Sequence, residues 1–144
     1  MSDTQMRAYL DQFDAIQREI LEELTDLPRQ ETRYATGSPR WNTVRRVLLR
    51  FGDHVREHTT QLVAACESIG ATQTMPQRML ARACADYGAF LGAVVGLADE
   101  SLDDVPEPGE WTPREVIEHI IEIQKRYLEM IQVARERGEI VEID

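Results

Sequence analysis

Apolar residues recur along four stretches of the chain at the three- and four-residue spacing of a helix. We predict helices over residues 4–26, 43–69, 76–98 and 113–136. The second stretch alternates steps of four and three through Val44, Leu48, Phe51, Val55, His58, Leu62, Ala65 and Ile69. This is the pattern of a bundle seam, with His58 within it and His54 at its edge.

Capping residues mark the ends of these stretches. The candidate N-caps are Asp3 for the first, Asn42 or Thr43 for the second, and Thr74 or Met75, just before Pro76, for the third. In the fourth, Thr112 opens a capping box that Glu115 completes. Gly70 and Gly138 predict the ends of the second and fourth helices.

The chain also repeats itself weakly. "TVRRVLLRF" at 43–51 aligns with "TPREVIEHI" at 112–120, and each follows a tryptophan, Trp41 or Trp111, and a proline-containing loop. We therefore predict an all-α protein, a four-helix bundle built from two pseudo-symmetric helical hairpins. Its 144 residues suit a single domain spanning 1–144.

Small residues line one face of the third predicted helix. Gly88, Gly92 and Gly96 fall four apart, although each interior glycine costs about 1 kcal/mol relative to alanine. The expected compensation is the close approach of another backbone. That backbone belongs either to a bundle neighbour or to a second subunit, which leaves a homodimer open.

Composition narrows the function classes. Hydrophobic residues make up 42% and charged residues 29%, a globular balance, and the net charge of −10 disfavours nucleic acid and anionic membranes as partners. The N-terminus lacks a secretion signal, and the apolar stretch 87–98 is too short to span a membrane. Cys66 and Cys84 lack metal or disulfide spacing, so we expect reduced core thiols in a cytoplasmic protein.

The three histidines carry the candidate chemistry. His54 and His58 are four apart, which places their Cβ atoms about 6 Å from each other on one helix face. His119 leans toward the apolar side of the fourth helix. Three imidazoles on one ion leave coordination positions open for water or substrate, as catalytic sites do. The sequence therefore predicts a metal site formed by His54, His58 and His119.

Nearby carboxylates leave alternatives open. Asp53, Glu57, Glu118 and Glu122 could hydrogen-bond three metal-free histidines, or could orient imidazoles that bind an ion. Glu122 lies one turn after His119. It is a candidate fourth ligand or general base, and a solvated surface charge is the alternative.

Two motifs resemble the DinB-like family of four-helix bundles over essentially the whole chain. "PGEWTPREVIEHI" is similar to the family's Pro-x-Gly-x-Trp segment followed by a histidine, here Trp111 and His119. "HVREHTTQL" is similar to its helix with paired histidines and a following Gln-Leu, here Gln61 and Leu62. In the family the paired histidines usually come last, and here they come first. Arg50 and Thr59-Thr60 also replace a histidine and an arginine-glycine that family members often carry.

The resemblance implies a divalent metal, zinc or nickel before iron, held by the three histidines. It also implies a metal-dependent enzyme acting on a small-molecule substrate that the sequence does not name. The reaction would be hydrolysis, or transfer to a low-molecular-weight thiol. The competing hypothesis is a non-catalytic helical bundle, perhaps dimeric in its third helix, that serves as a binding or stress protein with a vestigial site.

Overall fold

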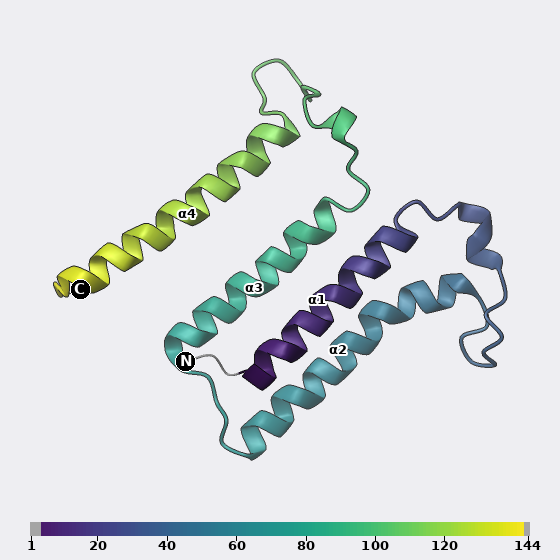
Figure 1. Cartoon of the computed structure of the whole chain (residues 1–144), viewed down its shortest axis with the longest axis horizontal. Coiled ribbons are helices and arrows are strands. Elements are labelled where there is room, and N and C mark those ends of the chain that lie inside the picture. Colours follow the sequence, from purple (N-terminus) through teal and green to yellow (C-terminus); the bar gives the residue numbers. More distant parts are fainter. Residues whose placement is uncertain (1–3, 143–144) are drawn as a thin grey trace. The chain divides into compact units, whose positions relative to one another are not determined.

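A computed structural model describes residues 4–142, and every regular element in that range is helical (Figure 1). The long helices are α1 (Thr4–Leu24), α2 (Val44–Ser68), α3 (Met75–Ala93) and α4 (Pro113–Arg137), and two short 3₁₀ helices, η1 (Arg29–Arg33) and η2 (Asp99–Ser101), precede α2 and α4. The predicted all-α class with four helices is confirmed. The 3₁₀ helices were not predicted.

Threonines begin three of the long helices. Thr43 accepts a hydrogen bond from the backbone N–H of Arg46, and both Thr74 and Thr112 form complete capping boxes. Gly138 follows α4 with a φ of 65°, the left-handed conformation that ends a helix. These caps match the predicted ones, except that Asp3 lies outside the described residues.

The third helix ends five residues earlier than predicted, at Ala93 rather than residue 98. Gly96 has a φ of 77°, which a helix cannot continue through and which glycine adopts at little cost. The apolar run 87–98 is therefore a helix followed by a turn. Periodicity alone did not reveal this, because Val94 and Val95 continue the apolar pattern past the true end.

The predicted repeat is present in the local structure. Both α2 and α4 have 25 residues, each follows a 3₁₀ helix, and each is capped by the aligned threonine. Arg50 on α2 and His119 on α4 occupy equivalent positions, because each lies seven residues after the threonine that caps its helix.

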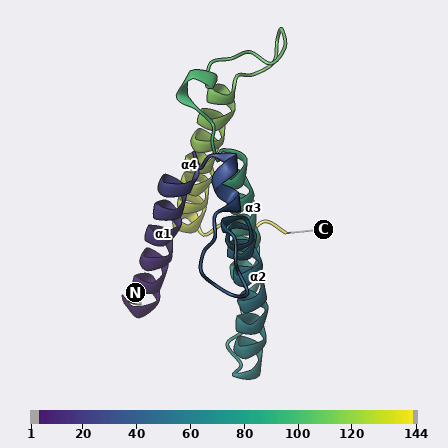
Figure 2. The ribbon, with the colours of Figure 1, turned by 90° about the vertical axis from the view of Figure 1, so that its right-hand side faces the viewer.

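The chain divides into two compact units, residues 1–96 and 97–144. In the first, α1 and α2 run antiparallel, and η1 packs against the start of α2 (Figures 1 and 2). In the second, the backbone N–H of Arg114 donates to the carbonyl of Leu102 at 2.9 Å, which fastens the loop after η2 to α4. The single domain over 1–144 stays a prediction.

Apolar side chains of the described units lie open rather than in a closed core. No described residue is buried, and Leu10, Phe13 and Leu62 are 55%, 48% and 62% exposed. Both cysteines are free. Cys66 is half-buried, whereas Cys84 is exposed, which contradicts the core position predicted for Cys84. None of the described helices has the length and apolarity of a membrane span.

The expected close approach at the glycine face is also absent from the described residues. A Cβ placed on Gly88 or Gly92 would meet no atom within 4 Å outside the helix's own backbone, and Gly96 lies beyond α3. No neighbouring backbone within the described residues approaches the two interior glycines, so the second-subunit alternative stays a prediction.

Candidate metal site

The paired histidines lie together in the middle of α2. The ring centroids of His54 and His58 are 4.5 Å apart, with an angle of 66° between the ring planes. Both residues are exposed, so their ring nitrogens can be reached from solvent. Two imidazoles one helical turn apart can direct one nitrogen each toward a shared cation. The structure therefore keeps the two histidines adjacent on α2, and their role as metal ligands stays a prediction.

Gln61 contacts one nitrogen of His58. The Nδ1 atom of His58 lies 2.8 Å from the Oε1 atom of Gln61, also on α2. With the amide oxygen as acceptor, a neutral imidazole carries its proton on Nδ1 and keeps its lone pair on Nε2, the outer nitrogen. Metal-binding histidines are commonly held in this way through the nitrogen that does not bind the ion.

The two carboxylates near the pair are engaged elsewhere. Glu57 accepts a hydrogen bond from Arg50 at 2.7 Å, and Asp53 pairs with Arg56 at 3.3 Å. The hydrogen bond and charge of Arg50 lower the pKa of Glu57, to which His58 and His54 add a smaller effect. Within residues 4–142, no hydrogen bond joins a histidine to a carboxylate. The alternative in which carboxylates satisfy metal-free histidines therefore lacks its contacts in this structure.

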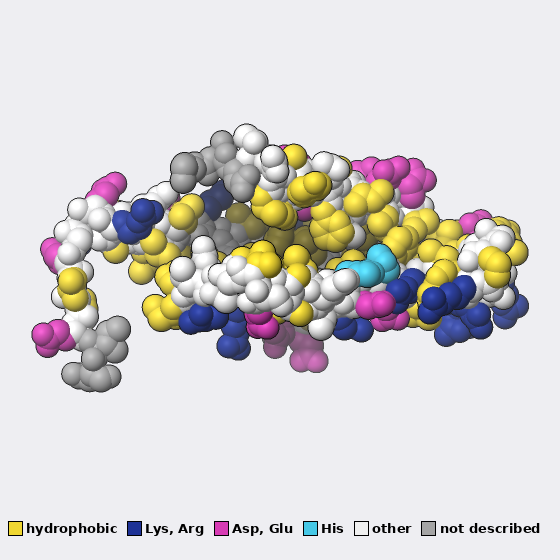
Figure 3. Space-filling model, turned by 90° about the horizontal axis from the view of Figure 1, so that it is seen from below, with side chains coloured by type: hydrophobic (Ala, Val, Ile, Leu, Met, Phe, Trp, Pro, Cys, Tyr) yellow, Lys and Arg dark blue, Asp and Glu magenta, His cyan; other side chains and the backbone are white. Residues whose placement is uncertain are grey.

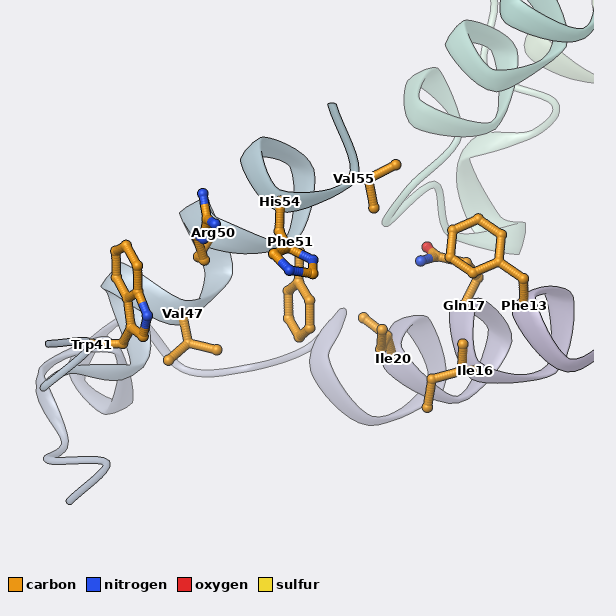
Figure 4. Close-up of a pocket in the computed structure, with 10 residues that line it drawn as sticks. All are labelled: Phe13, Ile16, Gln17, Ile20, Trp41, Val47, Arg50, Phe51, His54 and Val55. Carbon is orange, nitrogen blue, oxygen red and sulfur yellow. The ribbon is translucent and has the colours of Figure 1, made fainter. Parts of the chain in front are cut away.

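An apolar pocket of about 370 Å³ lies beside His54, between α1 and α2. In Figure 4, the His54 and Phe51 side chains extend from α2 toward the part of α1 that carries Ile16 and Ile20. The residues that line this apolar pocket are Phe13, Ile16, Gln17, Ile20, Trp41, Val47, Arg50, Phe51, His54 and Val55. One ligand candidate thus borders a space that an apolar group can fill.

His119 lies in the second unit and contacts Trp111. Their ring centroids are 4.9 Å apart with the planes at 74°, an edge-on packing of the imidazole against the indole. At the equivalent place in the first unit, Arg50 lies over Trp41 at 5.2 Å, and Arg40 lies over the same ring at 4.8 Å. The repeat therefore preserves a tryptophan beside a basic side chain while exchanging histidine for arginine.

Glu122 belongs to a charged groove on α4. The groove has a volume of about 600 Å³, and Glu118, Lys125 and Arg126 also line it. His119 is not among its lining residues. The proposed role of Glu122 as ligand or base stays a prediction.

The complete three-histidine set also stays a prediction. Among residues 4–142, no three side chains of His, Cys, Asp or Glu are grouped closely enough to hold a metal ion. The donors nevertheless suit zinc or nickel, because imidazole nitrogens bind both and the contact with Gln61 engages only the inner nitrogen of His58. Sequence reasoning missed the pairing of Arg50 with Glu57, although their spacing of seven residues places them on one helix face.

Comparison with known protein families finds a match to part of the chain. Residues 85–143 match the model of the DinB superfamily, while no curated protein and no solved structure matches. The match contains Trp111 and His119 and excludes the paired-histidine motif of 54–62. Residues 85–143 of this chain therefore belong to the DinB superfamily.

Proposed function

We propose that this protein is a metal-dependent enzyme in which His54, His58 and His119 hold one divalent ion. The observation that carries the proposal is the His54–His58 pair, with 4.5 Å between ring centroids and the Oε1 atom of Gln61 at 2.8 Å from the Nδ1 atom of His58. Membership of residues 85–143 in the DinB superfamily supports His119 as the third ligand. Zinc or nickel suits this donor set, with iron as a further candidate.

The chain's own residues supply binding and orientation. Gln61 engages the inner nitrogen of His58, which would leave the outer nitrogen for the ion, and Trp111 packs edge-on against the ring of His119. The apolar pocket beside His54 would hold a hydrophobic part of the substrate next to the ion. Glu122 is the candidate proton acceptor. When bound, a divalent ion supplies a Lewis acid that lowers the pKa of water or of a thiol.

Two reactions follow from this chemistry. Water as the nucleophile makes the protein a hydrolase, whereas a low-molecular-weight thiol makes it a transferase. The apolar pocket does not distinguish the two, since it would bind the substrate rather than the nucleophile. A product that forms only when a thiol is added would identify the transferase.

The first test is metal content, measured by elemental mass spectrometry on protein purified without a histidine tag. The protein is incubated with zinc or nickel and then dialysed. The variants are His54→Ala, His58→Ala and His119→Ala. Tyr127→Ala is the matched control, because Tyr127 is exposed on α4 at the position that aligns with His58.

We expect about one equivalent of metal in the wild type and in the control, and loss of the metal in each histidine variant. Metal retained by His119→Ala but lost from the other two would place the ion on α2 alone and refute the three-histidine site. No metal in the wild type would refute the enzyme mechanism. The protein would then be better explained as a non-catalytic bundle, and its oligomeric state and partners become the next question.

A further inference from the structure

Positive charge is concentrated in one short segment of this acidic protein. Residues 28–50 contain six arginines and one glutamate, a net charge of +5, so the rest of the chain carries −15. Figure 3 shows dark blue side chains gathered at the end of the first unit that contains η1 and the start of α2. The charge asymmetry is therefore a property of the surface as well as of the sequence.

Part of this segment forms a pocket of about 730 Å³. Its lining residues are all of polar or charged type: Arg29, Gln30, Thr32, Arg33, Thr43 and Arg45. Three arginines thus line one concave space together with two threonines and a glutamine. Arginine offers a planar fork of N–H donors that matches the oxygens of carboxylate and phosphate groups.

Backbone contacts hold the walls of the pocket together. The N–H of Val44 donates to the carbonyl of Tyr34 at 3.0 Å, and the N–H of Thr36 donates to that of Asn42 at 3.2 Å. Within η1, the hydroxyl of Thr32 donates to the carbonyl of Arg29 at 2.6 Å. The arginines from η1 and α2 therefore project from a fixed framework rather than from a free loop.

In the part of the chain that the structure describes, no ion pair engages the pocket arginines. Among residues 4–142, the ion pairs use Arg50, Arg56 and Arg114, none of which lines this pocket. Three like charges in one concavity repel each other unless an anion joins them, and an anion would turn that repulsion into attraction. The missing counter-charge is the feature that points to a ligand.

We propose that this pocket binds a small molecule that carries two or more oxyanion groups, either phosphates or carboxylates. The size of the pocket suits a metabolite, and the charge of −15 elsewhere disfavours a long polyanion such as RNA. The site contains none of the three histidines. The inference therefore goes beyond the proposed function and does not depend on it.

The test is calorimetric titration of the full chain, stripped of metal, with pyrophosphate and separately with citrate. Arg45→Gln removes one pocket arginine. Arg46→Gln is the matched control, because it makes the same charge change at the next residue of α2 without touching the pocket lining. His58→Ala tests independence from the histidines, and circular dichroism checks that each variant keeps its helices.

We expect saturable binding of at least one probe, weakened about tenfold or more by Arg45→Gln and less than twofold by Arg46→Gln or His58→Ala. Binding of pyrophosphate alone would identify a phosphorylated ligand, and binding of citrate alone a polycarboxylate. Equal weakening by Arg45→Gln and Arg46→Gln would overturn the proposal, because it would reflect overall charge. No saturable binding of either probe would overturn it as well.

Discussion

Gln61 offers the most direct test of how the histidine pair is organised. Replacing Gln61 by Leu keeps a side chain of similar size but removes the acceptor that lies 2.8 Å from the Nδ1 atom of His58. The ring can then rotate and change tautomer, so the outer nitrogen is free only part of the time. Loss of such a partner typically lowers metal affinity tenfold to a hundredfold, or about 1.4–2.7 kcal/mol. We expect the same for zinc here.

The assay is competition for zinc against a chromophoric chelator, with wild type, Gln61→Leu, His58→Ala and Gln132→Leu compared. Gln132 is exposed on α4, about 20 Å along the helix axis from His119, so its replacement controls for the loss of an amide. We expect Gln61→Leu to lie between the wild type and His58→Ala. If Gln61→Leu binds zinc within twofold of the wild type while His58→Ala does not bind, the hydrogen bond does not orient the ligand, and the reasoning is wrong.

Three further predictions concern the unit that contains α4. Thr112→Ala removes the acceptor that lies 3.2 Å from the N–H of Glu115 and should lower the free energy of unfolding by about 1 kcal/mol in urea titrations; no change would contradict the cap. The hydrogen bond and charge of Arg114 hold the pKa of Asp103 below its ordinary value of about 3.8, so this pair stabilises the fold above that pH and ceases to do so as the pH falls through the lowered pKa. Asp103→Asn should therefore lower the Tm at pH 6 but hardly at pH 2, and an equal effect at both would contradict the pairing. Gly138→Ala places a Cβ at a φ of 65° and should cost about 1 kcal/mol in the same titrations, whereas a neutral result would argue against the left-handed cap.

The helices were predictable because their signals are local. Thr112 and Glu115 specify a helix start by themselves, and Gly138 specifies its end, so α4 differs from its predicted span by a single residue. The end of α3 was not predictable from periodicity, because the left-handed turn at Gly96 follows two valines that extend the apolar pattern. Local signals also could not reveal η1, whose packing depends on contacts with α2.

In the candidate site too, contacts between residues close in the sequence were predictable, whereas contacts between separate elements were not. His54, His58 and Gln61 lie within two turns of one helix, so their spacing in the sequence was enough to bring them together. The partnership of Trp111 with His119 is likewise local, eight residues along the chain. Joining His119 to the α2 pair requires the packing of whole helices, which no residue spacing encodes. The arginine pocket was missed because its lining comes from two elements separated by a loop.

The placement of the two tryptophans gives the protein a built-in pair of optical reporters. The chain has two, Trp41 in the first unit beside two guanidinium groups and Trp111 in the second beside an imidazole. Indole emission responds to charge and to protonation next to the ring. A Trp41→Phe variant would therefore report events at His119, and a Trp111→Phe variant events at Arg40 and Arg50. Each unit could then be followed through its own tryptophan, without an added label.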